Sequence, residues 1–300
     1  MKKKRIIAFL KGGLGNQCFI YAAARTLADT TGAQLCLSLD YFPGDKTYRR
    51  EYDLGCFKVK GEVLPMSGWI VRQFEELRYK VCRKLCKDRV GNFCLDHPPF
   101  TYIPLPRDWE GDLLLDGYWH ACGYYKDSMP GICDDFELAG DDSWLVNDRL
   151  YEEITANSKS FFCHVRSYKE VPGHSNGDMS AKVTYYEKAL RFMRERLGAD
   201  AVCYLFSDDL EWARTRLSSV IAEMGLNVVP VGAVVGVNGQ LRDFMLMRAC
   251  SNGIVGNSSF SGFAGVLADC GARKRGRNGI FTYPANELPP EYFPDYWIRQ

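Results

Sequence analysis

Residues 4–17 read KRIIAFLKGGLGNQ, and this stretch decides the class of fold. Its apolar first half predicts a short buried β-strand, and its glycines predict a turn. Residues 18–29 are alanine-rich and apolar on most faces, as expected for a buried helix. Gly32 ends that helix, and residues 33–39 predict a second strand. The chain therefore opens with a strand–turn–helix–strand unit, the start of a parallel α/β sheet.

The rest of the chain divides into an irregular and a regular part. Residues 41–144 are rich in aromatic residues, proline and glycine, whereas the second half alternates strand and helix patterns. We expect strands at residues 112–118, 160–165, 201–206, 228–231 and 253–255, and helices near residues 71–86, 185–197, 210–223, 241–250 and 261–269. The fold class is thus α/β, with two Rossmann-like domains facing a cleft: an N-terminal domain over residues 1–155 and a C-terminal domain over residues 156–300.

The composition excludes several classes of partner. The 300 residues are 46% hydrophobic and 25% charged, which is typical of a soluble protein with a real core. With a net charge of +1, the protein has no overall positive electrostatic field that would attract nucleic acid. Any anion must therefore be bound by a few specific residues. The apolar run at residues 6–10 is too short for a signal peptide, and no run approaches a membrane span. We therefore expect a cytoplasmic protein.

The twelve cysteines are scattered among apolar neighbours and indicate small buried side chains in a reducing compartment. Cys82, Cys86, Cys94 and His97 could supply four zinc ligands. However, the first pair is separated by three residues on a predicted helix, whereas zinc knuckles use two. We expect no metal site.

The glycine turn is the first candidate site. Backbone N–H groups at Gly13 and Gly15 can approach a phosphate or sugar at a helix N-terminus, and the amides of Asn16 and Gln17 are suited to hydroxyls. A tight packing turn is the alternative. A dinucleotide site is a weaker interpretation, because Cys18 stands where its third glycine belongs.

The second candidate is His164-Val165-Arg166 at the end of a predicted strand. Strand alternation places His164 and Arg166 on one face. Arg166 can bind a diphosphate with two parallel hydrogen bonds, and His164 can add a further donor. A surface ion pair is the alternative interpretation.

Two later strand ends also carry polar residues. Asp208 and Asp209 precede a predicted helix, where we expect helix capping together with hydrogen bonds to a nucleotide base or ribose. The alternative is that the two acids bind a metal ion, but adjacent residues in a turn rarely both direct their side chains at the same ion. The last group precedes another helix and predicts a phosphate cradle, with an ordinary capped helix start as the alternative. It comprises Asn257, Ser258, Ser259 and Ser261.

The order of these motifs resembles the bacterial α-1,2-fucosyltransferase family. The resemblance covers the glycine turn, residues 164–166, residues 206–212, residues 246–250 and residues 257–261. It implies an inverting transfer of fucose from GDP-fucose to a galactose-type hydroxyl, with no cofactor or required metal. It also implies that the second domain holds the donor, with His164 and Arg166 at the diphosphate, residues 257–261 around the phosphates, and Asp208 and Asp209 near the nucleoside.

The sequence departs from the family pattern after Arg166. Ser167-Tyr168-Lys169-Glu170 stands where a second arginine and Gly-Asp-Tyr are usual, and Lys169 is the candidate to restore the missing charge. The donor could therefore be a different nucleotide sugar, or the chain could be a non-catalytic glycan-binding relative. An NAD(P)-dependent oxidoreductase is a further alternative.

The expected partners are a nucleotide-sugar donor and an oligosaccharide or glycolipid acceptor. Peripheral contact with the inner face of a membrane, through the acceptor, is left open. The general base that would deprotonate the acceptor is not identified. Its candidates are Glu170, Asp178, His174 and Asp116.

Overall fold

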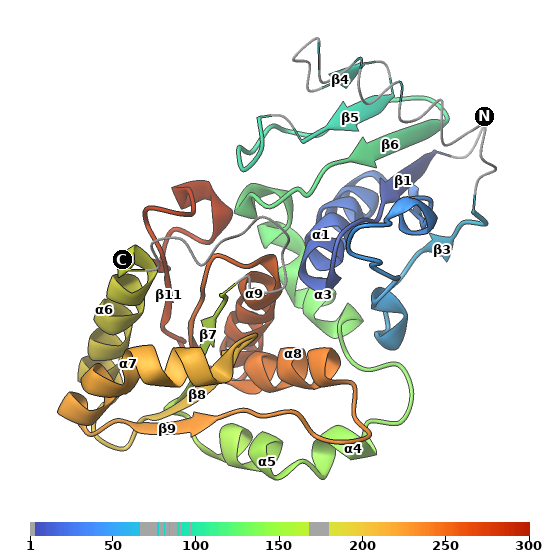
Figure 1. Ribbon diagram of the computed structural model, residues 1–300. Coiled ribbons are helices and arrows are strands. Elements are labelled where there is room, and N and C mark those ends of the chain that lie inside the picture. The colour runs from blue at the N-terminus through green and yellow to red at the C-terminus, as the bar shows by residue number, and fades with distance from the viewer. Residues whose placement is uncertain are drawn as a thin grey trace. The chain divides into compact units, whose positions relative to one another are not determined.

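The computed structural model describes residues 4–66, 77, 81, 84, 89–90, 92–96, 98–167 and 180–300. Contacts within the chain group it into two compact units. Unit 1 comprises Met1–Gly140 and Glu291–Pro294, and unit 2 comprises Asp141–Pro290 and Asp295–Gln300. Each unit is built on its own six-stranded sheet (Figure 1).

The sheet of unit 1 has the strand order β3-β2-β1-β6-β5-β4, and all its pairings are parallel except that between β4 and β5. Its strands are β1 (Arg5–Phe9), β2 (Gln34–Ser38), β3 (Glu62–Val63), β4 (Arg89–Val90), β5 (Phe93–Leu95) and β6 (Asp112–Asp116). Its helices are α1 (Leu14–Thr31), α3 (Met129–Asp135) and the 3₁₀ turns η1 (Phe42–Gly44), η2 (Leu54–Cys56), η3 (Cys122–Tyr124) and η4 (Lys126–Ser128). The strand order reverses between β1 and β6, which is where sheets of this kind bind ligands.

The opening unit expected from residues 4–39 is confirmed. Helix α1 begins after Gly13 and ends at Gly32, whose left-handed backbone (φ 67°) donates its N–H to Ala28 O at 2.9 Å. Its alanine-rich middle is buried, because the helix packs closely on the sheet. The β1–β2 pairing is parallel, as a strand–helix–strand crossover requires.

The sheet of unit 2 is parallel throughout, with the order β12-β11-β10-β7-β8-β9. Its strands are β7 (Ser160–Val165), β8 (Val202–Ser207), β9 (Asn227–Pro230), β10 (Asn252–Ile254), β11 (Phe281–Tyr283) and β12 (Ile298–Arg299). Its helices are α4 (Ser143–Val146), α5 (Arg149–Ala156), α6 (Ser180–Leu197), α7 (Leu210–Met224), α8 (Gly239–Ala249) and α9 (Ser259–Lys274). The 3₁₀ turn η5 (Pro290–Tyr292) lies where the chain passes from unit 2 to unit 1. The order reverses between β7 and β10.

The two parallel α/β sheets confirm the predicted fold class. Every strand and helix expected after residue 158 is present, with small shifts at the ends. The short strands β11 and β12 were not anticipated. Of the helix expected at residues 71–86, most lies outside the described residues.

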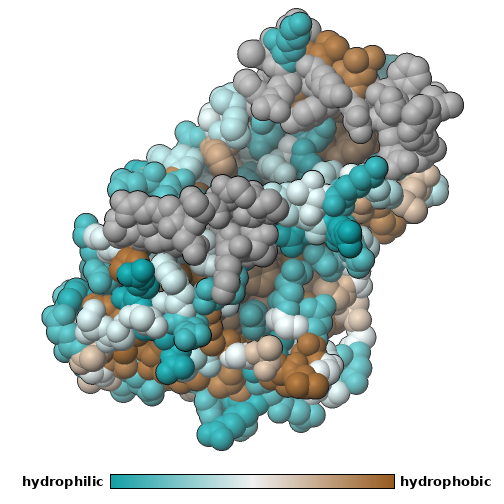
Figure 2. Space-filling model, viewed as in Figure 1, coloured by the Kyte–Doolittle hydropathy of each residue, from teal (hydrophilic) through white to brown (hydrophobic). Residues whose placement is uncertain are grey.

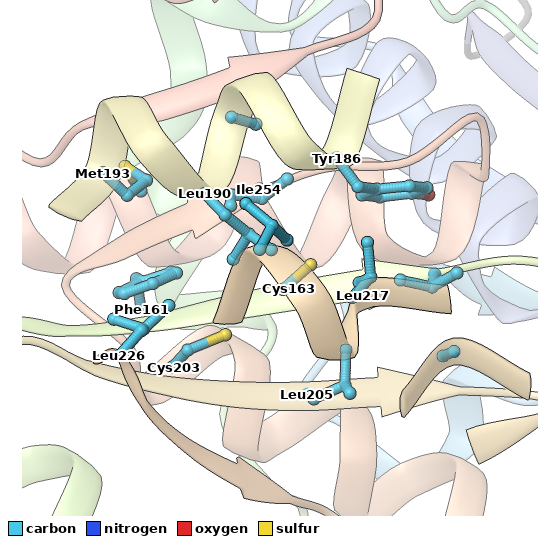
Figure 3. Packing of buried hydrophobic residues seen from close by; sticks show 14 of the residues in the cluster. Phe161, Cys163, Tyr186, Leu190, Met193, Cys203, Leu205, Leu217, Leu226 and Ile254 are labelled. Atoms are coloured by element: carbon cyan, nitrogen blue, oxygen red, sulfur yellow. The ribbon is translucent and has the colours of Figure 1, made fainter. Parts of the chain in front are cut away.

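The core of unit 2 lies between β7, β8 and the helices α6 and α7 (Figure 3). All six residues of β7 are buried, so both faces of the sheet are covered. Cys163 and Cys203 are part of this core, beside Leu190 and Leu217. The described cysteines are buried except for the half-buried Cys56, which confirms that they act as small apolar side chains.

The division between the units falls at Gly140 and Asp141, whereas the sequence pattern suggested residue 155. Residues 141–155 count with unit 2 because α5 packs on α8. A buried ion pair adds to this contact, with Arg242 Nε donating to Asp148 Oδ2 at 2.5 Å. The assignment of acceptor and donor to the two parts of the chain stays a prediction.

The surface carries no extended apolar band on the face shown in Figure 2, where hydrophobic residues lie in small patches among hydrophilic ones. Among the helices of the described residues, none combines the length and apolar character that a membrane crossing requires.

Candidate functional site

Three of the predicted polar segments meet at one edge of the unit 2 sheet. Strand β7 pairs with β8 on one side and with β10 on the other, so their carboxyl ends lie next to one another. Arg166 follows β7, Asp208 follows β8, and Asn257 follows β10. This edge contains the point between β7 and β10 where the strand order reverses.

Arg166 is held at this edge by Asp208. Its Nη1 donates to Asp208 Oδ2 at 2.9 Å, while the backbone N–H of Ser167 donates to Oδ1 at 2.7 Å. Burial acts to raise the pKa of Asp208, but the Ser167 hydrogen bond and the charge of Arg166 outweigh it and lower that pKa. Asp208 is therefore ionised at neutral pH and fixes the end of β7 against the end of β8.

His164 is a buried, neutral imidazole beside this pair. Burial, with a contribution from the charge of Arg166, lowers its pKa to about 4. Its ring tilts against Phe260 with a centroid distance of 5.9 Å. Within the described part of the chain, His164 Nδ1 has no hydrogen-bond partner. A buried ring nitrogen without a partner calls for an explanation, and ligand binding at this edge is one.

A glycine permits the close packing behind His164. The hydroxyl of Tyr186, on α6, donates to His164 O at 3.0 Å. A Cβ atom at Gly256 would lie 2.4 Å from that hydroxyl and 2.7 Å from His164 O. Gly256 therefore lets β7, β10 and α6 approach one another at the carboxyl edge. Tyr186 is not predictable from the sequence, because nothing in a helical pattern distinguishes a tyrosine whose hydroxyl reaches a distant carbonyl.

The N-terminus of α9 lies at the same edge. Ser258 is its N-cap residue, with an extended backbone, and in this described segment its side chain makes no capping hydrogen bond. The first N–H groups of a helix favour anions, so an uncapped start leaves them to a ligand or solvent. Asn257 Nδ2 donates to Glu287 Oε2 at 2.8 Å. Ser261 is buried and donates to Ser258 O at 3.3 Å, which stabilises the first turn.

Asp209 caps a helix, as predicted. Its Oδ1 accepts from the Trp212 N–H at 3.1 Å, at the start of α7. A contact of Asp209 with a nucleoside stays a prediction, as do the ligand roles of Ser258, Ser259 and Ser261.

The glycine turn belongs to unit 1. Gly13 is the N-cap residue of α1, and Asn16 Oδ1 lies 3.2 Å from His120 Nε2. Gln17 is fully buried and donates to Gly12 O at 3.0 Å and to Glu51 O at 2.8 Å. Its amide therefore fixes the loop that follows β2. The roles of Gly13, Gly15, Asn16 and Gln17 in donor binding stay predictions.

Several predicted residues lie outside the described residues. They are Tyr168, Lys169, Glu170, His174, Asp178, Cys82, Cys86 and His97. Asp116, the remaining candidate base, lies in unit 1, where its Oδ1 is 2.5 Å from Lys11 Nζ. Within the described ranges, no three His, Cys, Asp or Glu side chains cluster as metal ligands would.

Asp243, on α8, is a candidate that the sequence analysis missed. Burial raises the pKa of its carboxyl to about 6, although the neighbouring charge of Arg242 opposes this shift. The next residue, Phe244, packs on Phe260 at the start of α9, with ring centroids 5.5 Å apart. Perturbed carboxyl groups are concentrated at functional sites. The available signal in the sequence was an acid beside the apolar run Phe244-Met245-Leu246-Met247.

Comparisons with known proteins match the chain to glycosyltransferases. Residues 147–279 match the model of Glycosyl transferase family 11. The O-antigen biosynthesis glycosyltransferase WbnK of Escherichia coli is 26% identical, over 84% of this chain and 86% of WbnK. An alpha-1,2-colitosyltransferase of Escherichia coli is 22% identical, over 98% of each chain.

Solved structures share the fold. A mutant of FUT1 from Arabidopsis thaliana in complex with GDP superposes with a TM-score of 0.54 and 14% identity, over 97% of this chain and 72% of that one. The fucosyltransferase NodZ from Bradyrhizobium gives a TM-score of 0.54 and 16% identity, over 90% and 95%. The family match sets aside an oxidoreductase and confirms the resemblance noted from the motifs. The chain is a glycosyltransferase, and its residues 147–279 are similar to family 11, the α-1,2-fucosyltransferase family.

Proposed function

We propose that this enzyme transfers fucose from GDP-fucose to a galactose-type hydroxyl of a glycan, forming an α-1,2 linkage with inversion. The observation that carries the proposal is the meeting of His164, Arg166 and the N-terminus of α9 at the reversal point of the unit 2 sheet. Unit 2 is then the donor-binding part and unit 1 the acceptor-binding part. The structure of NodZ alpha-1,6-fucosyltransferase soaked with GDP-fucose, which shares this fold, supports the choice of donor.

The residues at this edge suit a leaving nucleoside diphosphate. As the sugar develops oxocarbenium character, negative charge accumulates on the diphosphate. Arg166 supplies a fixed positive charge, and the first N–H groups of α9 supply partial positive charge. His164 is neutral at pH 7, so it contributes a hydrogen bond rather than a charge. Asp208 keeps the guanidinium at the strand end before the donor binds.

We also propose that the reaction needs no divalent cation, because these protein groups can neutralise the diphosphate. Direct displacement inverts the anomeric carbon and benefits from a base at the acceptor hydroxyl. Asp116 is the described candidate, and the others are Glu170, His174 and Asp178.

The acceptor is an oligosaccharide or glycolipid in this proposal, in keeping with the relative named for O-antigen biosynthesis. The enzyme works in the reducing cytoplasm in this proposal, where a glycolipid acceptor would bring it to the inner face of a membrane. No nucleic acid is involved.

A second candidate is the transfer of colitose. The colitosyltransferase relative aligns with 98% of this chain, which favours it. Because Ser167 replaces the usual second arginine of the motif, the motif does not distinguish a fucose donor from a colitose donor. A panel of GDP-sugars assayed against galactosides distinguishes the two, and detectable turnover excludes a non-catalytic glycan-binding protein.

The decisive experiment is the steady-state kinetics of Arg166→Ala. Removal of a donor that stabilises developing charge typically lowers kcat about 10²–10³-fold, which is roughly 3–4 kcal/mol. We expect a smaller rise in the KM for the donor, and only partial rescue by Arg166→Lys, since an ammonium cannot make two parallel hydrogen bonds. Arg191→Ala is the matched control, because Arg191 pairs with Glu223 on the exposed surface of unit 2. Near-normal kcat in folded Arg166→Ala would remove this edge from the active site.

A further inference from the structure

A second ion pair lies at the carboxyl edge of the unit 2 sheet. Glu287 follows β11, which is the neighbour of β10 in the sheet. Its Oε2 accepts the hydrogen bond from Asn257 Nδ2 at 2.8 Å and lies 4.0 Å from Lys182 Nζ. Lys182 belongs to the first turn of α6. Its ammonium is therefore close to Asn257, the residue that precedes the N-cap of α9.

Helix α6 is fixed to the strand ends at this place. Tyr185 donates its hydroxyl to Val255 O at 2.7 Å, and Tyr186 donates its hydroxyl to His164 O at 3.0 Å. Both tyrosines are buried. Lys182 stands three residues before Tyr185 and four before Tyr186, so it lies on the same face of the helix. The helix therefore directs Lys182 at the ends of β7 and β10.

The two ion pairs at this edge are alike in charge and burial. Asp208 accepts a hydrogen bond from Arg166, and Glu287 lies beside Lys182, so each cation has a carboxylate next to it. The exposed fractions of the four side chains lie between 14% and 24%. Charges at such positions interact more strongly than charges in water. These four charges sum to zero, so a phosphate meets no surplus of positive charge from them until a carboxylate moves.

The pair of Lys182 and Glu287 is the looser of the two. Its separation of 4.0 Å is longer than a charge-assisted hydrogen bond, whereas Arg166 Nη1 lies 2.9 Å from Asp208 Oδ2. A lysine also has a flexible stem and an ammonium whose donors can rotate. Lys182 can therefore leave Glu287 with a smaller loss of electrostatic energy than Arg166 can leave Asp208.

We propose that Lys182 binds the phosphate groups of the nucleotide sugar, and that Glu287 is the carboxylate that they displace. A phosphate offers the same kind of acceptor oxygen as Glu287, at a helix N-terminus where an anion is favoured. Glu287 lowers the affinity for the nucleotide, because its charge must move away from the phosphates. The proposal rests on the proposed function, since it concerns the same donor.

Two further observations support this assignment. Among the residues that the structure describes, the buried Nδ1 of His164 lacks a hydrogen-bond partner, which independently indicates a ligand at this edge. The residue after Arg166 is Ser167, which carries no charge and whose backbone N–H is bound to Asp208. Lys169, expected from the sequence to supply a second charge, lies outside the described residues. Lys182 brings a second cation to this edge from a different element, α6.

The test measures three probes on the full chain: GDP and inorganic pyrophosphate by calorimetry, and guanosine by saturation-transfer NMR. Lys182→Ala should raise the Kd of GDP and of pyrophosphate roughly tenfold, the loss of one charge-assisted hydrogen bond, and leave the Kd of guanosine within about twofold. Glu287→Gln should lower the Kd of GDP about threefold, because glutamine keeps an acceptor for Asn257 and removes the charge. This gain should largely disappear when Lys182→Ala is also present.

Two matched controls lie in the same unit. Lys188→Ala removes a lysine that is exposed on α6. Glu223→Gln removes an acid that forms an exposed ion pair with Arg191. Neither should change the Kd of GDP by more than about twofold. Lys182→Arg guards against a folding defect, because it keeps the charge and should bind GDP within about threefold of wild type, with unchanged circular dichroism.

Normal GDP binding by Lys182→Ala would overturn the role of Lys182, and so would a loss of guanosine affinity as large as the loss of GDP affinity. A rise in the GDP Kd of Glu287→Gln would show that Glu287 binds the nucleotide itself. An equal gain with and without Lys182 would show that Glu287 does not act through the lysine. A wild-type protein that binds pyrophosphate through Lys182 but does not bind GDP contradicts the proposed donor and leaves this inference standing. Binding of neither probe overturns both.

Discussion

Replacing Asp243 by asparagine should stabilise the protein at neutral pH and leave its stability at low pH almost unchanged. Burial raises the pKa of this carboxyl from 3.8 to about 6. The folded state therefore binds more protons than the unfolded state between these two values. Wild-type stability falls as pH rises through this window, and the loss is complete above the folded pKa. An asparagine resembles the protonated acid and avoids the loss.

The size of the effect follows from the shift. About two pKa units correspond to roughly 3 kcal/mol, and solvent screening of this half-buried side chain reduces that to about 2 kcal/mol. Urea unfolding of wild type and Asp243→Asn at pH 7 and at about pH 3.5, below both pKa values, gives the difference in unfolding free energy at each pH. All other ionisable groups are present in both proteins, so their contributions cancel in the difference between the two unfolding free energies. Asp295→Asn is the control, because Asp295 is exposed in the same unit.

A stability difference between Asp243→Asn and wild type that is equal at both pH values would refute the reasoning, since it would show that the carboxyl has no raised pKa.

Three further predictions concern the donor site. Turnover should survive excess EDTA, and a loss that Mn²⁺ or Mg²⁺ restores would contradict this. Gly256→Ala should lower the free energy of unfolding, measured in urea, by about 1–3 kcal/mol, because the added methyl group would contact Tyr186 Oη and His164 O. Adding Tyr186→Phe to that variant should restore part of the lost stability. Asp208→Asn should lower kcat less than Arg166→Ala does, since it only loosens the guanidinium; an equal or larger loss in kinetic assays would give Asp208 a direct role.

The elements that end at the carboxyl edge of the unit 2 sheet could be predicted from the sequence, because their signals are local. A strand that ends in His164 and Arg166, and helices that begin near Asp209 and Ser259, follow from alternation, capping and helical periodicity. Parallel strands then bring their carboxyl ends together without any knowledge of side-chain contacts. The fold class followed from the same reasoning.

What the sequence could not predict depends on contacts between distant residues. The Asp208–Arg166 pair joins positions on two different strands, and Gln17 reaches the loop after β2. Nothing in the neighbouring sequence indicates that the Gln17 amide would be buried and hydrogen-bonded to the backbone. Strands β11 and β12 have three and two residues, which is too short for a pattern to emerge.

The return of Glu291–Pro294 to unit 1 has a consequence for biosynthesis. Tyr125 donates its hydroxyl to Tyr292 O at 3.1 Å, and the Tyr292 ring contacts Phe19 and His120. The part of the chain that leaves the ribosome first therefore completes its aromatic core only after the C-terminal segment has been made. A truncation before residue 291 would remove this tyrosine from the N-terminal half, so fragments cut between the two sheets would not reproduce the intact units.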